Sequence, residues 1–130
     1  MLRYVFQYKF SILLVIVIAL LSLVPGSSMP YPSLFSIPYI DKIVHLSMYA
    51  SLGFVALMES RRNRQGSVYH LFIIAVIFLL SGLIEILQAT VVATRGAEWT
   101  DLLANLAGLF AGYLAYRFMG GFRLFRFLKS

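Results

Sequence analysis

The stretch LFIIAVIFLLSGLIEILQATVV, from Leu71 to Val92, decides the fold class of this chain. An α-helix rises about 1.5 Å per residue, so the stretch is long enough to cross roughly 30 Å of hydrocarbon. It is almost entirely apolar, yet Glu85 and Gln88 lie near its C-terminal end. An ionisable side chain at the centre of a span costs about 2.5–3.5 kcal/mol even on a lenient scale. The stretch therefore predicts a membrane helix that carries part of a polar site.

The composition of the whole chain agrees with this interpretation. Of its 130 residues, 61% are hydrophobic and 12% are charged, and the mean hydropathy is +0.87. Soluble domains are about 45–50% apolar and about 25% charged. We therefore predict a single domain, residues 1–130, in an integral membrane protein. The chain has no cysteine, which excludes disulfides, thiol nucleophiles and metal–thiolate centres.

Four apolar stretches predict an all-α membrane bundle of four transmembrane helices. The expected spans are Phe10–Val24, Asp41–Met58, Leu71–Val92 and Asp101–Met119. The first is slightly short and could instead be a signal peptide. No Ala-x-Ala-like cleavage pattern follows it, so we expect it to stay in the protein.

The basic residues predict the orientation. Four crossings place nine of the 11 basic residues on one side, and only Lys42 and Arg95 on the other. By the positive-inside rule, both termini are cytoplasmic. This topology accounts for the net charge of +6, so we expect no nucleic-acid partner. The nine inward residues are Arg3, Lys9, Arg61, Arg62, Arg64, Arg117, Arg123, Arg126 and Lys129.

Polar residues inside the second and third spans follow helical spacing. Asp41, His45 and Tyr49 are spaced i, i+4, i+8, which puts them on one face of the second span. Glu85 and Gln88 are spaced i, i+3 and share a face of the third. All five fall in the outer halves of their spans, so we expect them to line one outward-facing pocket.

The fourth span completes this polar set. It opens with Asp101, Asn105 lies one turn below, and Arg95 precedes them in a short turn. Because polar faces must avoid lipid, we predict that His45, Glu85 and Asn105 face one another inside the bundle. The candidate pocket residues are Asp41, Lys42, His45, Tyr49, Glu85, Gln88, Arg95, Asp101 and Asn105.

Purely structural roles stay open for most of these residues. Asp41 and Asp101 could cap their helices, and Asn105 and Gln88 could only join helices through hydrogen bonds. Glu85 fits such a role least, because no helix cap or interface needs a carboxylate at that depth. Separately, Gly108 and Gly112 form a GxxxG pattern that predicts close helix packing, either within the chain or between chains.

Three elements of this polar set resemble those of VanZ-like membrane proteins. The segment DKIVHLSMY (41–49), followed by Leu52 and Gly53, resembles their D-K-x-x-H-x-x-x-Y-x-x-L-G element. EILQ (85–88) resembles their E-x-x-Q element, and Arg95 with DLLANLAG (101–108) resembles R…D-x-x-x-N-x-x-G. The resemblance covers about residues 40–112. Glu98-Trp99-Thr100 stands where the family often has a serine-rich turn.

The resemblance implies a multi-pass protein of the bacterial inner (cytoplasmic) membrane. The family is named for a protein associated with reduced sensitivity to teicoplanin, a glycopeptide that binds cell-wall precursors. A cell-envelope factor of this type would use its pocket to bind a lipid headgroup or a lipid-linked cell-wall precursor.

Two other functions stay open. One is an intramembrane enzyme with His45 as general acid/base and Arg95 stabilising phosphate charge. The other is a structural subunit that binds another membrane protein. We favour the non-catalytic factor and expect no cofactor, since no nucleotide-binding loop is present. His45, Glu85 and Asp101 are acceptable metal ligands, but a single histidine and no HExxH motif lead us to expect no metal.

The predicted topology can be tested by cysteine labelling, because the chain itself has no cysteine. A cysteine introduced as Asn63→Cys lies between Arg62 and Arg64 and should be cytoplasmic. We expect an impermeant maleimide to label it only in inverted vesicles or lysed cells. Labelling in intact cells would reverse the orientation.

Overall fold

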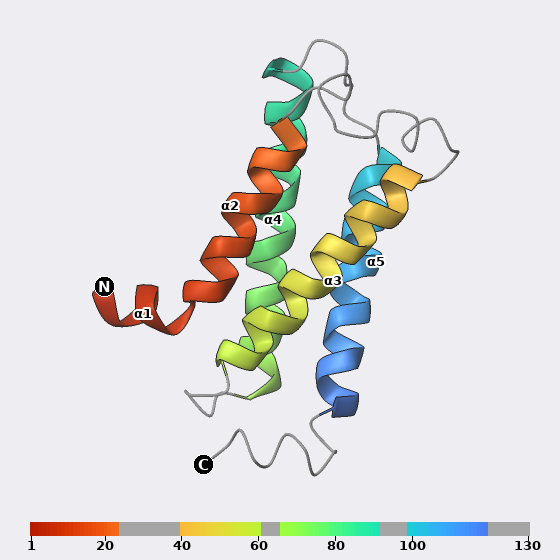
Figure 1. Ribbon diagram of the computed structural model, residues 1–130. Coiled ribbons are helices and arrows are strands. Elements are labelled where there is room, and N and C mark those ends of the chain that lie inside the picture. The colour runs from red at the N-terminus through yellow and green to blue at the C-terminus, as the bar shows by residue number, and fades with distance from the viewer. Residues whose placement is uncertain (24–39, 61–65, 92–98, 120–130) are drawn as a thin grey trace.

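The computed structural model describes residues 1–23, 40–60, 66–91 and 99–119, and the regular elements in these ranges are all α-helices (Figure 1). In chain order they are α1 (Leu2–Gln7), α2 (Lys9–Leu23), α3 (Ile40–Ser60), α4 (Ser67–Val91) and α5 (Trp99–Met119). The prediction of an all-α protein is confirmed.

Within the described ranges, three helices are long and apolar enough to cross a membrane: α3, α4 and α5. They correspond to the second, third and fourth predicted spans. Helix α4 begins at Ser67, before the predicted start at Leu71, because hydropathy marks only the hydrocarbon-facing part of a helix. Helix α2 has 15 residues, about 22 Å of length, and is the shorter apolar helix.

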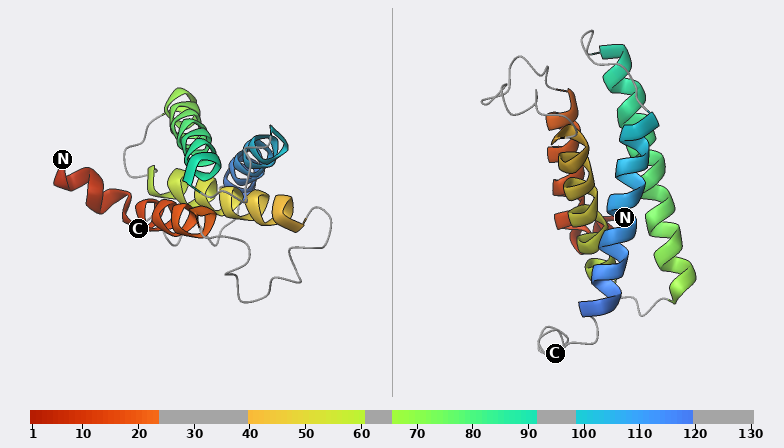
Figure 2. Two further views of the ribbon diagram at one scale, coloured as in Figure 1. Left: turned by 90° about the horizontal axis from the view of Figure 1, so that it is seen from above. Right: turned by 90° about the vertical axis from the view of Figure 1, so that its right-hand side faces the viewer.

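Helices α2 to α5 form two layers. Figure 2 shows α2 and α3 in one layer and α4 and α5 in the other. Helix α3 packs most extensively on α5 and also contacts α2 and α4. The ends of α2 and α4 and the starts of α3 and α5 lie at the same end of the bundle, the upper end in Figure 1. Polar residues from different spans can therefore meet there.

Two glycines allow the close contact of α5 with α3. A Cβ atom added at Gly108 would collide with the backbone oxygen of Leu46, and one at Gly112 with that of Ala50. The GxxxG pattern is thus used for packing within the chain. The contact joins the two helices backbone to backbone.

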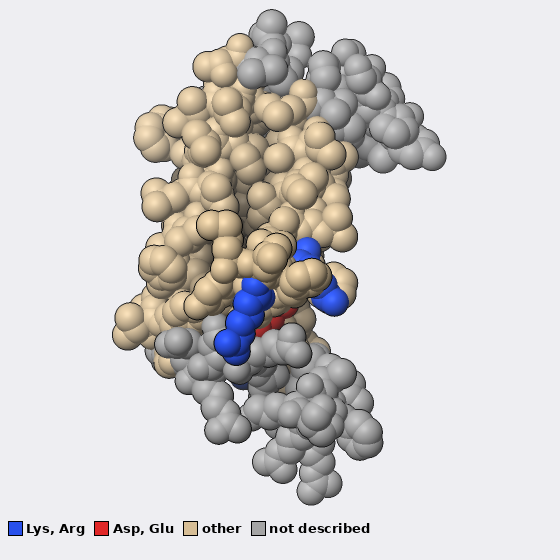
Figure 3. Space-filling model, turned by 90° about the vertical axis from the view of Figure 1, so that its left-hand side faces the viewer, with Lys and Arg blue, Asp and Glu red and all other residues tan. Residues whose placement is uncertain are grey.

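The surface of the described helices is largely apolar. The buried apolar cluster is small and centres on residues such as Ile18, Leu52 and Leu109. Large side chains such as Leu79, 73% exposed, point outward. On the face shown in Figure 3, the charged side chains of the described residues lie near the lower end, and the described surface above them is uncharged. An apolar surface of this extent needs lipid to cover it.

At the lower end, Glu59 joins α3 to the start of α2. Its carboxylate accepts hydrogen bonds from the backbone N–H groups of Phe10, at 2.9 Å, and Ser11, at 3.1 Å, and from the Ser11 hydroxyl. The first N–H groups of a helix have no intrahelical partner and favour a negative charge. Glu59 therefore caps a helix that is distant in sequence.

Tyrosine side chains add a second contact at this end. The hydroxyls of Tyr8 and Tyr69 lie 2.8 Å apart, which links the start of α2 to α4. Partial burial and this hydrogen bond raise the pKa of Tyr8 above its ordinary value, so the phenol stays protonated.

We expect Gly112→Ala to destabilise the protein by about 1–3 kcal/mol, because the added methyl group collides with the α3 backbone. Gly82→Ala is the matched control, since a Cβ atom there meets nothing within 4 Å. That variant should be neutral or slightly more stable, as alanine is the better helix former. Reversible unfolding in detergent micelles measures both. Equal stability of the two variants would contradict the close contact.

Candidate functional site

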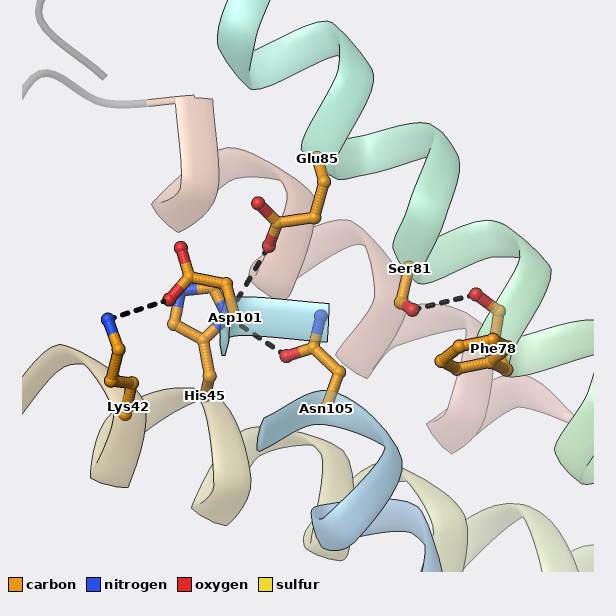
Figure 4. Close-up of polar contacts among 7 residues, drawn as sticks. All are labelled: Lys42, His45, Phe78, Ser81, Glu85, Asp101 and Asn105. Carbon is orange, nitrogen blue, oxygen red and sulfur yellow. Dashed lines mark hydrogen bonds and ion pairs between the residues drawn. The ribbon is translucent and has the colours of Figure 1, made fainter. Parts of the chain in front are cut away.

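The candidate site lies at the upper end of the bundle, where α3 and α5 begin and α4 ends (Figure 4). His45 belongs to α3, Glu85 to α4, and Asp101 and Asn105 to α5. Their helical spacing puts Asp101 and Asn105 on one face of α5, directed at His45 and Glu85. Three separate helices thus deliver polar groups to one point.

His45 is the centre of the cluster. Its Nδ1 atom lies 3.0 Å from Oδ1 of Asn105 and 3.7 Å from Oε1 of Glu85. When Nδ1 carries the hydrogen, it donates to the Asn105 oxygen. The three side chains that the sequence predicts to face one another do so.

Lys42 and Asp101 form an ion pair at the edge of this cluster. The Lys42 Nζ atom lies 3.3 Å from Oδ1 of Asp101. Asp101 also lies in the first turn of α5, where the positive end of the helix dipole favours a carboxylate. Asp101 therefore combines a favourable charge at the start of α5 with an ion pair to α3.

The cluster is buried within the described part of the chain. Asn105 has no exposed surface, Glu85 is 3% exposed, and His45 and Asp101 are each 8% exposed. Lys42 is the more open member, with 24% of its side chain exposed. Buried charges are unfavourable unless they are paired or bind an ion, so this arrangement needs each of its partners.

The four remaining predicted pocket residues lie outside these contacts or outside the described part of the chain. Tyr49 and Gln88 are buried, one helical turn from His45 and Glu85 respectively. Asp41 lies in the first turn of α3, but its side chain is outside the described part, as is Arg95 as a whole. Direct contacts join Lys42 to Asp101, and His45 to Glu85 and Asn105. The two groups lie side by side, since ligand atoms of His45, Glu85 and Asp101 are within 4.8 Å of one another.

Ser81 is a buried polar residue that the sequence prediction missed. It has no exposed surface, and its hydroxyl donates a 2.7 Å hydrogen bond to the backbone oxygen of Phe78. Ser81, Glu85 and Gln88 are spaced i, i+4, i+7, so helical spacing could have placed it on the polar face of α4. Its own contact is local, within α4.

The cluster contains groups that can bind a cation. His45, Glu85 and Asp101 each offer one ligand atom, and these atoms lie within 4.8 Å of one another. The same groups could also exchange protons, because a histidine faces a carboxylate.

Comparison with known families identifies the chain. The family model described as VanZ/LLP1 matches residues 1–120. The chain belongs to the VanZ/LLP1 family. No curated protein and no solved structure matches it. The VanZ/LLP1 match includes α1 and α2, so it extends beyond the residues 40–112 that carry the resemblance in the sequence.

We expect Asn105→Leu to destabilise this VanZ/LLP1 protein by about 1–3 kcal/mol. The side chain keeps its approximate volume, but the buried His45 ring loses its 3.0 Å partner. Ser51→Ala is the control, because Ser51 is exposed and bonds only to the backbone oxygen of Ser47 among the contacts seen. Unfolding in detergent micelles should separate the two variants. A neutral Asn105→Leu would mean that the hydrogen bond does not hold the cluster.

Proposed function

We propose that this VanZ/LLP1 protein is a cell-envelope factor of the bacterial inner membrane that binds an anionic headgroup in its polar pocket. The ligand would be a membrane lipid or a lipid-linked cell-wall precursor. The observation that carries the proposal is the buried cluster of Lys42, His45, Glu85, Asp101 and Asn105. Ionisable residues at membrane depth are costly and are typical of functional sites.

The proposed topology has four spans with both termini in the cytoplasm. Helix α2 is short, but it lies alongside α3 and α4, and Lys9 at its start can extend its charge to the interface. By the positive-inside rule, the basic residues of the sequence support a lower end of the bundle that faces the cytoplasm. The cluster at the upper end would then open to the outside of the cell, where cell-wall precursors are used.

Lys42 is the residue best suited to meet an anionic group. It is the most exposed member of the contacting cluster, and its ammonium group is a compact positive charge. Glu85, Asp101 and Asn105 would orient the polar part of the headgroup. Arg95 would add a planar fork for phosphate, as the sequence suggests.

The resemblance to VanZ-like proteins suggests a link to antibiotics. A pocket that binds a cell-wall precursor or a lipid headgroup would change how a glycopeptide such as teicoplanin reaches its target. We propose this as the cellular consequence of headgroup binding.

An intramembrane enzyme is the second candidate. The 3.7 Å approach of Glu85 to His45 supports it, because a carboxylate that orients one ring nitrogen leaves the other available as general acid/base. An enzyme would convert a lipid-linked phosphate into new products, whereas a binding factor would leave it unchanged.

The binding proposal can be tested with the purified protein in phosphatidylcholine nanodiscs. The probes are phosphatidylglycerol and a polyprenyl phosphate, with retention and mass measured by native mass spectrometry. We expect Lys42→Gln to weaken retention of both about 10-fold or more, since it removes a charge-assisted contact. Lys9→Gln, which removes a lysine at the opposite end of the bundle, should bind as the wild type does.

Three outcomes decide between the candidates. Wild-type protein that retains neither anionic lipid, or Lys42→Gln that retains both normally, contradicts the binding proposal. If the wild type changes the mass of a lipid probe and Glu85→Gln does not, the result favours the enzyme. In cells, Glu85→Gln should alter teicoplanin sensitivity at normal protein abundance; loss of abundance alone would indicate a structural subunit.

A further inference from the structure

We propose that His45, Glu85 and Asp101 form a binding site for one divalent transition-metal ion. The three residues come from α3, α4 and α5, so the ion would join three helices at one point (Figure 4). This departs from the expectation that a single histidine is too few for a metal site. It does not depend on headgroup binding.

The spacing of the ligand atoms fits such an ion. Zinc binds nitrogen and carboxylate oxygen at roughly 2.0–2.2 Å, which sets neighbouring ligand atoms of a tetrahedral site about 3.4 Å apart. The Nδ1 atom of His45 is 3.7 Å from Oε1 of Glu85, and the ligand atoms of all three residues lie within 4.8 Å. Side-chain rotations that move these ligand atoms by about 1 Å would bring them to the spacing of a tetrahedral site.

The donor atoms indicate the class of metal. Imidazole nitrogen favours zinc, iron and related ions, whereas calcium and magnesium prefer all-oxygen sites. One imidazole with two carboxylates provides three protein ligands, and three ligands leave a position open for water or an anion. We therefore expect Zn²⁺ to bind more tightly than Ca²⁺ or Mg²⁺.

The surroundings resemble the outer shell of a metal site. Metal-bound carboxylates and histidines are held by further hydrogen bonds that fix their orientation. Lys42 contacts Asp101 at 3.3 Å and would hold that carboxylate in place. A dication between Glu85 and Asp101 would also offset two carboxylate charges in a buried place.

An independent observation points to a missing ligand. The Nδ2 atom of Asn105 is buried and has no hydrogen-bond partner among the described residues. Asn105 itself has no exposed surface, so bulk water does not compensate this donor. A water or anion in the open position of the metal would accept its hydrogen bond.

The test uses Zn²⁺ with the full chain, purified without a histidine tag in an uncharged detergent. No cysteine is present, and His45 and His70 are the two histidines. We expect one Zn²⁺ per chain by calorimetry and by elemental analysis after dialysis. His45→Ala should weaken binding at least 100-fold. His70→Ala is the matched control and should bind as the wild type does, because His70 lies at the opposite end of α4.

Two further variants keep the test valid if His45→Ala fails to fold. Glu85→Gln and Asp101→Asn keep the side-chain shape and remove one ligand charge each, so each should weaken Zn²⁺ binding at least 10-fold. Visible absorption of Co²⁺ in the same site should change with each variant. Absence of stoichiometric Zn²⁺ binding by the wild type, or unchanged affinity in both carboxylate variants, would overturn the proposal.

The result is separable from the headgroup proposal. Zn²⁺ binding is measured here without any anionic lipid, and headgroup retention can be repeated with a chelator present. Zn²⁺ binding without lipid retention supports the metal site and contradicts the proposed function. Lipid retention without Zn²⁺ binding supports the function and overturns the metal site.

Discussion

The backbone contact between α3 and α5 sets the position of everything at the polar end of the bundle. Gly108 lies against the backbone of Leu46, the residue after His45, and Asn105 precedes Gly108 by one helical turn. The same register that seats Gly108 on α3 therefore brings Asn105 within hydrogen-bond distance of His45. A larger residue at Gly108 or Gly112 would push α5 away from α3. That shift would also separate Asn105 from His45.

The cost of polar groups in lipid explains why the cluster is shared among three helices. Each helix alone would expose its carboxylate or imidazole to hydrocarbon, which is unfavourable by several kcal/mol. Packing α4 beside α5 and α3 places Glu85 against His45 instead. The polar residues thus determine which faces of the helices turn inward. The apolar side chains do not, because lipid and protein interior suit them equally well.

The sequence was sufficient for features that depend on local spacing. Hydropathy located α3, α4 and α5, and helical periodicity, together with the cost of burial, predicted that His45, Glu85 and Asn105 would meet. It could not specify contacts set by the three-dimensional arrangement. The pairing of Lys42 with Asp101 depends on the register of α5 on α3. Glu59 likewise caps α2 by accepting a hydrogen bond from Ser11, which lies 48 residues away along the chain.

Glu59 also shows why α2 belongs to the same structural unit as the site. Helix α3 carries the cluster near its start and Glu59 near its end, so one helix connects the polar end of the bundle to the first helices. Since the carboxylate of Glu59 satisfies N–H groups at the start of α2, the position of α2 also depends on α3. The extent of the family match, from α1 through α5, is consistent with a fold in which α3 is the shared contact of every long helix.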